Sequence, residues 1–208
     1  MTKDSDFKWA CFISYRHGES ELTQSFIKEL YRALQSSINA NFTGKLNIYW
    51  DEARLRGGDI IDEELAINLC KSVCMIVVFT PFYFDNERRY CSREYKAMEI
   101  LEAQRSNIIG EQLSLIIPIV FRGTPPKGIT TRKYYDFSKY SLLEPEIIKN
   151  PKFYRDIEEI AQRILEIYLR LEIKKKDFCE DCASFTLPKE KDALVRSLIT
   201  KNKPLFPR

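Results

Sequence analysis

Three short segments of the chain carry the side chains best suited to chemistry. They hold Tyr15 and Arg16, then Arg54, then Tyr90, Cys91 and Glu94. A guanidinium fork matches phosphate oxygens, so both arginines are candidates for phosphate contacts. An aromatic ring can pack against a flat base, and a carboxylate can stabilise positive charge that grows in a transition state. Taken singly, the glutamate also fits a solvated helix face, and Arg16 fits a strand-exit arginine paired with a nearby acid.

Apolar runs that alternate with amphipathic segments indicate how these side chains are positioned. Continuous apolar runs suit strands covered on both faces, and strands that alternate with helices predict an α/β fold with a parallel sheet. Ligands bind such sheets beyond the carboxyl ends of the strands, which is where Tyr15 and Arg16 fall. The patterns predict strands at 9–15, 46–50, 74–80, 113–121 and 134–137, helices after Ser20 and at 62–69, 90–104 and 153–171, and a loop at 123–128.

Length and composition indicate one soluble domain. The chain has 208 residues and a formal net charge of +3, which is too weak a bias to argue for nucleic acid as a partner. No signal-peptide core follows the polar N-terminus, and the apolar run 113–121 is too short to span a membrane. We therefore expect a cytoplasmic protein without a membrane partner, with a domain at 1–174 and a C-terminal extension at 175–208 that docks on the domain or on a partner.

The six cysteines predict buried thiols more readily than a metal site. We expect Cys11, Cys70, Cys74 and Cys91 to be reduced thiols in a cytosolic core. The remaining two, Cys179 and Cys182, form a single CxxC pair, which supplies two ligands where structural zinc needs four. With His17 as the one histidine, neither a metal nor a redox role is expected for the pair.

The three segments, in this order and spacing, resemble the TIR (Toll/interleukin-1 receptor) domain family. Phe-Ile-Ser-Tyr-Arg at 12–16 looks like the first family motif, and Asp-x-x-x-Leu-x-x-Gly at 51–58 looks like the BB loop. Tyr-Cys-x-x-Glu at 90–94 looks like the aromatic-Cys-x-x-Glu motif of TIR enzymes, with Tyr90 where the family usually has tryptophan. The resemblance covers about residues 7–171. It implies a flavodoxin-like five-stranded parallel sheet with helices on both faces.

The resemblance also implies an activity. TIR enzymes cleave the nicotinamide–ribose bond of NAD+ with a glutamate at the position of Glu94, so we expect NAD+ to be the substrate and no cofactor to be needed. Nicotinamide in NAD+ is already cationic and leaves without a general acid, through an oxocarbenium-like transition state that one carboxylate can stabilise. Arg16 and Arg54 are then candidates for diphosphate contacts, Tyr15 and Tyr90 for ring packing, and Cys91 for a place beside the substrate.

A single TIR domain is similar to the stand-alone prokaryotic antiphage proteins of the Thoeris type. That likeness implies a cyclic or conjugated ADP-ribose signal, a separate effector that responds to it, and self-association through TIR–TIR contacts. The alternative is an adaptor that docks on other TIR domains with Glu94 idle. A third interpretation, a receiver-like or flavodoxin-like ligand-binding domain, predicts an acidic or glycine-rich loop after the first strand, where the sequence has a basic one.

Overall fold

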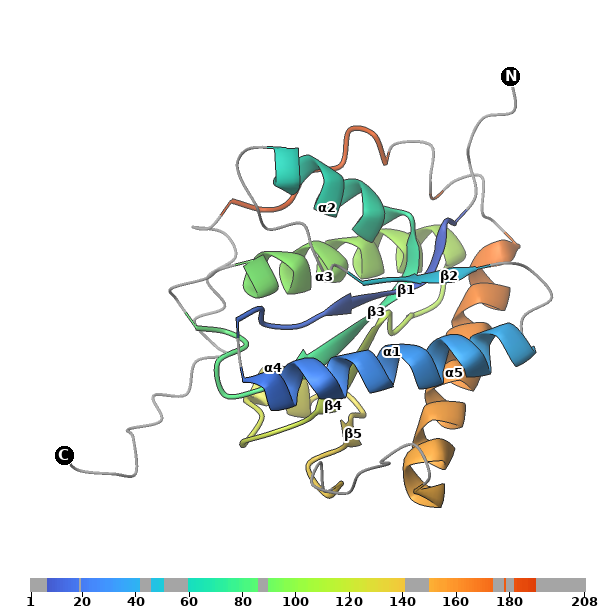
Figure 1. The fold of residues 1–208 in the computed structure, drawn as a ribbon. Helices are drawn as coiled ribbons and strands as arrows, with labels where there is room; N and C mark the ends of the chain where they lie inside the picture. Colours follow the sequence, from blue (N-terminus) through green and yellow to red (C-terminus); the bar gives the residue numbers. More distant parts are fainter. Residues whose placement is uncertain are drawn as a thin grey trace.

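A five-stranded parallel sheet forms the centre of the computed structural model, with strand order β2-β1-β3-β4-β5 (Figure 1). The structure describes residues 7–18, 20–41, 46–50, 60–85, 90–140, 150–173, 178 and 182–189. The strands are β1 (Trp9–Ser14), β2 (Asn47–Tyr49), β3 (Ser72–Phe79), β4 (Ile116–Val120) and β5 (Tyr135–Asp136). The helices are α1 (Glu21–Asn41), α2 (Ile60–Cys70), α3 (Tyr90–Ile109), α4 (Lys127–Thr130) and α5 (Pro151–Glu172).

Helices cover both faces of this sheet, as the sequence predicts. Helices α2 and α3 lie on one face, and α1 packs against α5 on the other (Figure 1). All eight residues of β3 are buried, which explains the continuous apolar run in its sequence. The apolar stripe of α5 is buried along its length, from Phe153 through Ile164 to Leu171. The predicted flavodoxin-like α/β fold is therefore confirmed.

Most differences from the predicted elements concern their ends. Strand β3 begins two residues early, α3 continues to Ile109, and β4 begins only at Ile116. The predicted loop at 123–128 includes the start of α4, a four-residue helix that begins after Pro126 in extended conformation. The hydroxyl of Ser20 accepts a hydrogen bond from the Thr23 amide at 3.4 Å, so the predicted cap of α1 is confirmed.

Pro118 lies in the middle of β4, where the missing N–H would normally cost a ladder hydrogen bond. The carbonyl of Leu115 accepts from Met75 of β3, whereas the carbonyl of Val120 accepts from Phe137 on the outer side. The backbone N–H and C=O groups of successive residues in a parallel strand point to opposite sides. The backbone nitrogen of Pro118 therefore faces the outer side of β4, like that of Val120. Strand β5 pairs only with Ile119 and Val120, so the proline lies beyond its end and removes no donor that β5 needs.

Two loops approach each other closely at the carboxyl edge of the sheet. Gly123, after β4, has a φ of +81°, and a Cβ added there would lie 2.6 Å from Cγ of Pro81, after β3. Glycine meets both requirements, because it adopts positive φ without strain and carries no side chain. This contact holds the two loops together next to the residues that follow β3.

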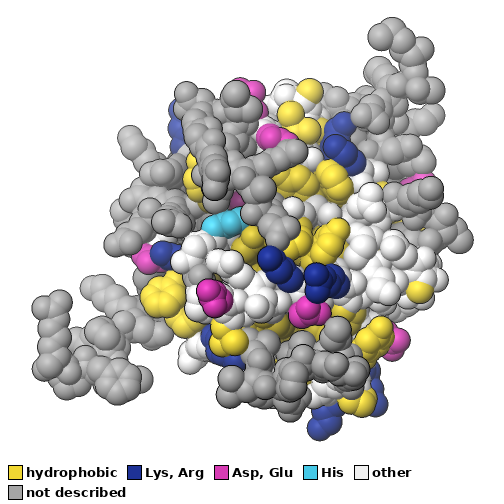
Figure 2. All heavy atoms as spheres, in the orientation of Figure 1, with side chains coloured by type: hydrophobic (Ala, Val, Ile, Leu, Met, Phe, Trp, Pro, Cys, Tyr) yellow, Lys and Arg dark blue, Asp and Glu magenta, His cyan; other side chains and the backbone are white. Residues whose placement is uncertain are grey.

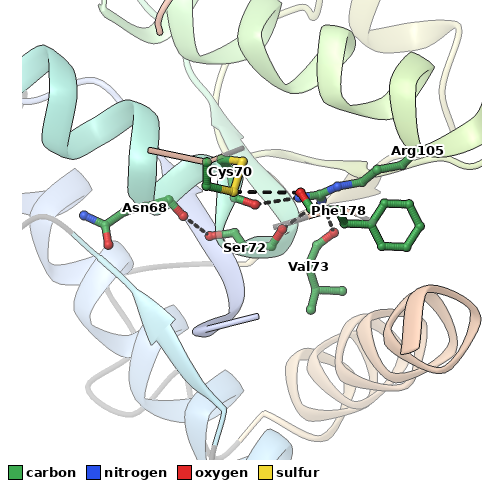
Figure 3. Close-up of a disulfide and its surroundings, with 7 residues drawn as sticks. Asn68, Cys70, Ser72, Val73, Arg105 and Phe178 are labelled. Carbon is green, nitrogen blue, oxygen red and sulfur yellow. Dashed lines mark hydrogen bonds between the residues drawn. A yellow bond between two sulfur atoms is a disulfide. The ribbon is translucent and has the colours of Figure 1, made fainter. Parts of the chain in front are cut away.

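The cysteines differ from the prediction in one respect. Cys70, the last residue of α2, forms a disulfide with Cys182, across 112 positions of sequence (Figure 3). The expectation that Cys70 is a reduced thiol is therefore wrong, and Cys182 is paired with the domain core rather than acting within the CxxC. Cys179 lies outside the described residues. Cys11, Cys74 and Cys91 are thiols, and all are buried, as predicted.

A buried arginine holds the backbone beside this disulfide. The guanidinium of Arg105, on α3, donates to the carbonyls of Cys70 at 2.6 Å, Ser72 at 2.9 Å and Val73 at 3.2 Å (Figure 3). Its Cζ lies 5.0 Å from the centroid of the Phe7 ring. Arg105 thereby satisfies carbonyls at the end of α2 and the start of β3, which fixes the turn that carries Cys70.

None of the described helices is both long and apolar enough to cross a lipid bilayer. On the face seen in Figure 2, basic, acidic and apolar side chains of the described residues lie interspersed. This mixture accords with the nearly balanced composition of 33 basic and 30 acidic residues.

Candidate functional site

Glu94 lies at the carboxyl edge of the sheet, where β1 and β3 end. In the sheet, β2 lies on one side of β1 and β3 lies on the other. The strand order therefore reverses at β1, and ligands of such sheets bind at this point. Glu94 is the fifth residue of α3 and is only 7% exposed. A solvated position on an exposed helix face is thus excluded for this carboxylate.

Hydrogen bonds join Glu94 to the ends of both strands. The hydroxyl of Ser14, the last residue of β1, donates to Oε2 of Glu94 at 2.5 Å. The same hydroxyl oxygen lies 2.6 Å from the hydroxyl of Tyr83, in the turn after β3. A serine hydroxyl has one proton, and this one is used toward Glu94, so the tyrosine must donate to the serine. The result is a directed chain from Tyr83 through Ser14 to the carboxylate.

Tyr83 is suited to act as a permanent donor in this chain. The residue is fully buried, and burial raises the pKa of its hydroxyl well above the usual range. The neighbouring Cys91 and Glu94 raise this pKa further, whereas the hydrogen bond with Ser14 lowers it. The tyrosine therefore stays protonated, and it keeps Ser14 oriented toward Glu94.

Arg16 lies next to this chain and is engaged in an ion pair. Its guanidinium donates to the Phe82 carbonyl at 2.8 Å and to Oδ2 of Asp85 at 3.0 Å, and it lies 5.5 Å from the centroid of the Phe82 ring. Its side chain is 15% exposed. This is the pairing with a nearby acid that we considered for a strand-exit arginine. A phosphate contact by Arg16, which stays a prediction, would require an exchange of partner from Asp85.

Tyr15 faces the β2 side of the site. Its hydroxyl accepts a hydrogen bond from the indole N–H of Trp50 at 3.2 Å, and its ring packs on that of His17 with centroids 4.3 Å apart. Tyr15 is 9% exposed, so most of the ring is covered by protein. The predicted ring packing against substrate would use the edge of the side chain that remains accessible.

Tyr90 and Cys91 belong to the first turn of α3, together with Glu94. Cys91 is buried and close enough to Tyr83 to affect its pKa. Tyr90 is half-buried, and the guanidinium of Arg93 lies 5.5 Å from the centroid of its ring. The structure thus brings Cys91 near Tyr83, and Tyr90 is the first residue of α3.

Three residues at this edge were assigned no role by the sequence analysis: Ser14, Tyr83 and Phe82. Phe82 is 56% exposed, an unusual state for a large apolar side chain, and it offers a ring face beside Arg16. The signal that could have found Tyr83 and Phe82 is their position directly after a buried strand. Arg54, a predicted substrate contact, lies outside the described residues.

A groove lies elsewhere on the domain. It has a volume of about 1370 Å³ and runs between α3, α5 and the outer side of β4. Its lining includes the ion pair of Arg132 with Glu102, in which two hydrogen bonds of 2.8 and 2.9 Å join the charged groups. None of the described site residues predicted from the sequence lines it, so the groove is separate from the candidate site.

One family of known proteins matches most of this chain. Among solved structures, the chain is similar to the TIR domains of the activated Roq1 resistosome, which directly recognises the pathogen effector XopQ. The identity is 16%, the TM-score is 0.33, and the match covers 86% of this chain and 85% of that one. No curated protein matches the chain at a significant level. Residues 11–146, which include Ser14, Glu94 and β5, match the TIR domain family, and the chain therefore belongs to that family.

Proposed function

We propose that this TIR domain cleaves NAD+ at the bond between nicotinamide and ribose, and that Glu94 is the catalytic residue. The observation that supports the proposal most is the short hydrogen bond from Ser14 to a buried glutamate at the carboxyl edge of the sheet. A hydroxyl that donates to a carboxylate favours its ionised form. A negative charge held in this way is what an oxocarbenium-like transition state requires.

The other predicted contacts follow from this placement. The ribose would lie against Glu94, with Cys91 beside it in the same helical turn. Tyr15, Phe82 and Tyr90 would offer ring surface to the bases. Arg16 would bind the diphosphate after releasing Asp85, and Arg54 would bind it from the loop after β2. No cofactor is needed for this step, because the nicotinamide ring of NAD+ is already cationic and takes the bonding electrons to leave as a neutral molecule.

The products and the biological setting are part of the proposal. Water would give ADP-ribose, whereas the adenine or a ribose hydroxyl of the substrate would give a cyclic product. We propose a cyclic or conjugated ADP-ribose signal in antiphage immunity, sensed by a separate effector, and activity that depends on TIR–TIR contacts in a cytoplasmic protein. An assembled site predicts a rate that rises more steeply than linearly with protein concentration.

Nicotinamide release from NAD+ by the purified protein tests the proposal. Glu94→Gln keeps the size of the side chain but removes its charge, and we expect it to abolish release. The matched control is Glu99→Gln on the same helix, whose carboxylate is 32% exposed and pairs with Lys96; its release should equal that of the parent protein. The mass and chromatographic behaviour of the nucleotide product would distinguish ADP-ribose from a cyclic isomer.

A second candidate function is an interaction module that works through TIR–TIR contacts without chemistry. It predicts no nicotinamide release by the parent protein, at any protein concentration or in crowded or infected-cell extract. Release by the parent that persists in Glu94→Gln would instead place the chemistry on another residue.

A further inference from the structure

The C-terminal segment at residues 182–189, here called the C-terminal strap, lies on the domain along α2. The disulfide joins Cys182 to Cys70, at the end of α2. At the other end of the strap, the carbonyl of Pro188 accepts a hydrogen bond of 2.8 Å from Nε of Arg93. Leu187 is buried, and Phe185 packs against the core. Figure 1 shows the strap passing over α2.

Arg93 links the strap to the first turn of α2. Its two terminal nitrogens donate to Oδ1 and Oδ2 of Asp62 at 3.1 and 2.6 Å. The arginine side chain is only 13% exposed. A bidentate pair of this kind fixes the guanidinium plane, and the remaining Nε–H then points to the Pro188 carbonyl. All three guanidinium nitrogens of Arg93 thus donate hydrogen bonds, and these bonds hold the first turn of α3 against α2 and the strap.

The two anchors lie at opposite ends of α2. Asp62 is in the first turn of the helix and Cys70 is its last residue, so the strap runs antiparallel to it. The helix from 62 to 70 spans about 12 Å, and six extended residues from 182 to 188 reach at most about 20 Å. The strap is therefore long enough to connect the two anchors.

We infer that Arg93, Asp62 and the C-terminal strap form a brace that positions Glu94, and that the Cys70–Cys182 disulfide controls this brace. Arg93 is a positioning residue, because it precedes Glu94 in the chain and its charged group points away to α2 and the strap. With the disulfide formed, the first turn of α3 is held from two sides. With the two thiols reduced, the strap loses this covalent link and keeps its packing and the hydrogen bond from Arg93 to Pro188.

The redox step is a thiol–disulfide exchange. A thiolate of an added dithiol attacks the sulfur of Cys182, which breaks the bond to Cys70 and forms a mixed disulfide. The second thiolate of the reagent then displaces Cys182 and closes a cyclic disulfide. Cys70 and Cys182 together gain two electrons and two protons. Oxidised glutathione reverses the step. Both cysteines are at most 3% exposed, so we expect slow reduction that requires the strap to lift.

This inference rests on the proposed function, and the test is nicotinamide release by the full chain at saturating NAD+, with the redox state verified by mass. Reduction and Arg93→Ala should each lower kcat about tenfold or more and change KM less than about twofold, because misplaced catalytic groups lose rate without losing binding. Arg93→Lys, which keeps the charge but not the fork, should lose less than Arg93→Ala.

Combination of the two changes separates a brace from a general loss of stability. If the disulfide acts through Arg93, the reductant should not lower the kcat of Arg93→Ala further. Cys182→Ser should behave like the reduced parent and should not respond to the reductant. If the reduced Arg93→Ala variant showed both losses of kcat multiplied together, the inference would be overturned. A parent protein whose kcat does not change on complete reduction would also overturn it.

Hydrogen exchange tests the brace even if the parent protein releases no nicotinamide. Reduction should speed amide exchange in peptides that cover 182–189 and in peptides that cover 90–94. Arg93→Ala should speed exchange in 90–94 with the disulfide intact. An inactive parent with these exchange changes would reject the proposed function and leave the brace in place. An active parent whose 90–94 amides do not respond would reject the brace alone.

Discussion

The hydroxyl of Ser14 donates a hydrogen bond of 2.5 Å to the carboxylate of Glu94, which lies 80 positions later in the chain. The bond joins the last residue of a central strand to the first turns of α3. β1 is paired with β2 as far as Phe12 and with β3 up to Ser14, which lies opposite Val77, so its end is held by the sheet. A catalytic carboxylate attached there is positioned by the sheet rather than by a loop.

Loss of the Ser14 hydroxyl should impair NAD+ cleavage. A hydrogen bond to a charged group contributes about 1.5–3 kcal/mol, so Ser14→Ala should lower kcat about tenfold or more. Tyr83→Phe should have a smaller effect in the same direction, because it removes the group that orients Ser14. The kcat of nicotinamide release by each variant, compared with that of the parent, checks this.

The matched control for that experiment is Ser37→Ala, which removes a hydroxyl from α1 that is also buried, at 9% exposure. Its kcat should equal that of the parent. If Ser14→Ala retained full activity, the hydrogen bond to Glu94 would have no part in catalysis.

The protein should lose stability at alkaline pH. Burial raises the pKa of Cys74 to about 12 and places the pKa values of Cys11 and Tyr83 well above their usual range. Above about pH 9 the unfolded chain ionises at these groups while the folded protein keeps their protons, so folding stability falls as pH rises. Each group contributes a slope of up to about 1.4 kcal/mol per pH unit.

Urea unfolding between pH 8 and 11 measures this slope. Tyr83→Phe should flatten it, because one of the groups that ionise only on unfolding is gone. Tyr154→Phe, at a position 45% exposed, is the control and should leave the slope as in the parent. A Tyr83→Phe protein with the parent's slope would mean that this hydroxyl ionises equally in both states.

Gly123→Ala should destabilise the fold more than Gly110→Ala. Both glycines have φ near +80°, so both variants carry the backbone strain of an L-residue in that region, about 1–2 kcal/mol. An added Cβ meets no atom within 4 Å at Gly110 but lies 2.6 Å from Pro81 at Gly123. The difference in unfolding free energy between the two variants therefore isolates the contact with Pro81. Equal losses in urea unfolding would show that the two loops separate without cost.

Arg105→Ala should be among the most destabilising single changes. It leaves three buried carbonyls without their guanidinium donor, at about 1–3 kcal/mol for each unsatisfied group. We expect a loss of at least about 3 kcal/mol in thermal or urea unfolding. Arg32→Ala is the control, since its side chain is 70% exposed and pairs with Glu29 on the same helix turn; it should cost about 0.5 kcal/mol or less. A mild Arg105→Ala phenotype would mean that water replaces the arginine.

The fold was predictable from the sequence because its signals are local. Alternation of apolar runs and amphipathic helices, as in β3 and α5, determines the layers and the parallel sheet. Strand ends were less well predicted: the apolar run that begins at Leu113 enters the strand only at Ile116, because the amides of Leu113 and Leu115 bond to side chains of α3. Apolar residues recur every four positions in α1: Leu22, in the first turn, is exposed, whereas Phe26, Leu30 and Leu34 are buried.

The candidate site was predictable only in part. The position of Glu94 follows from its motif and from the rule that sites lie at the carboxyl ends of parallel strands. Its partners do not follow: the bond from Ser14 and the pairing of Arg16 with Asp85 depend on which side chains meet across the sheet edge. The Cys70–Cys182 disulfide was missed for the same reason, since no spacing in the sequence connects residues 112 positions apart.

Pro118 determines how copies of this protein can meet at the outer edge of the sheet. A strand from a second copy that tried to extend β4 would find no donor at Pro118, and it would have to enter a groove occupied by the charges of Arg132 and Glu102. Backbone pairing of the kind that builds fibrils is disfavoured at this edge. An assembly that uses this face would therefore have to be held by side-chain contacts rather than by backbone pairing.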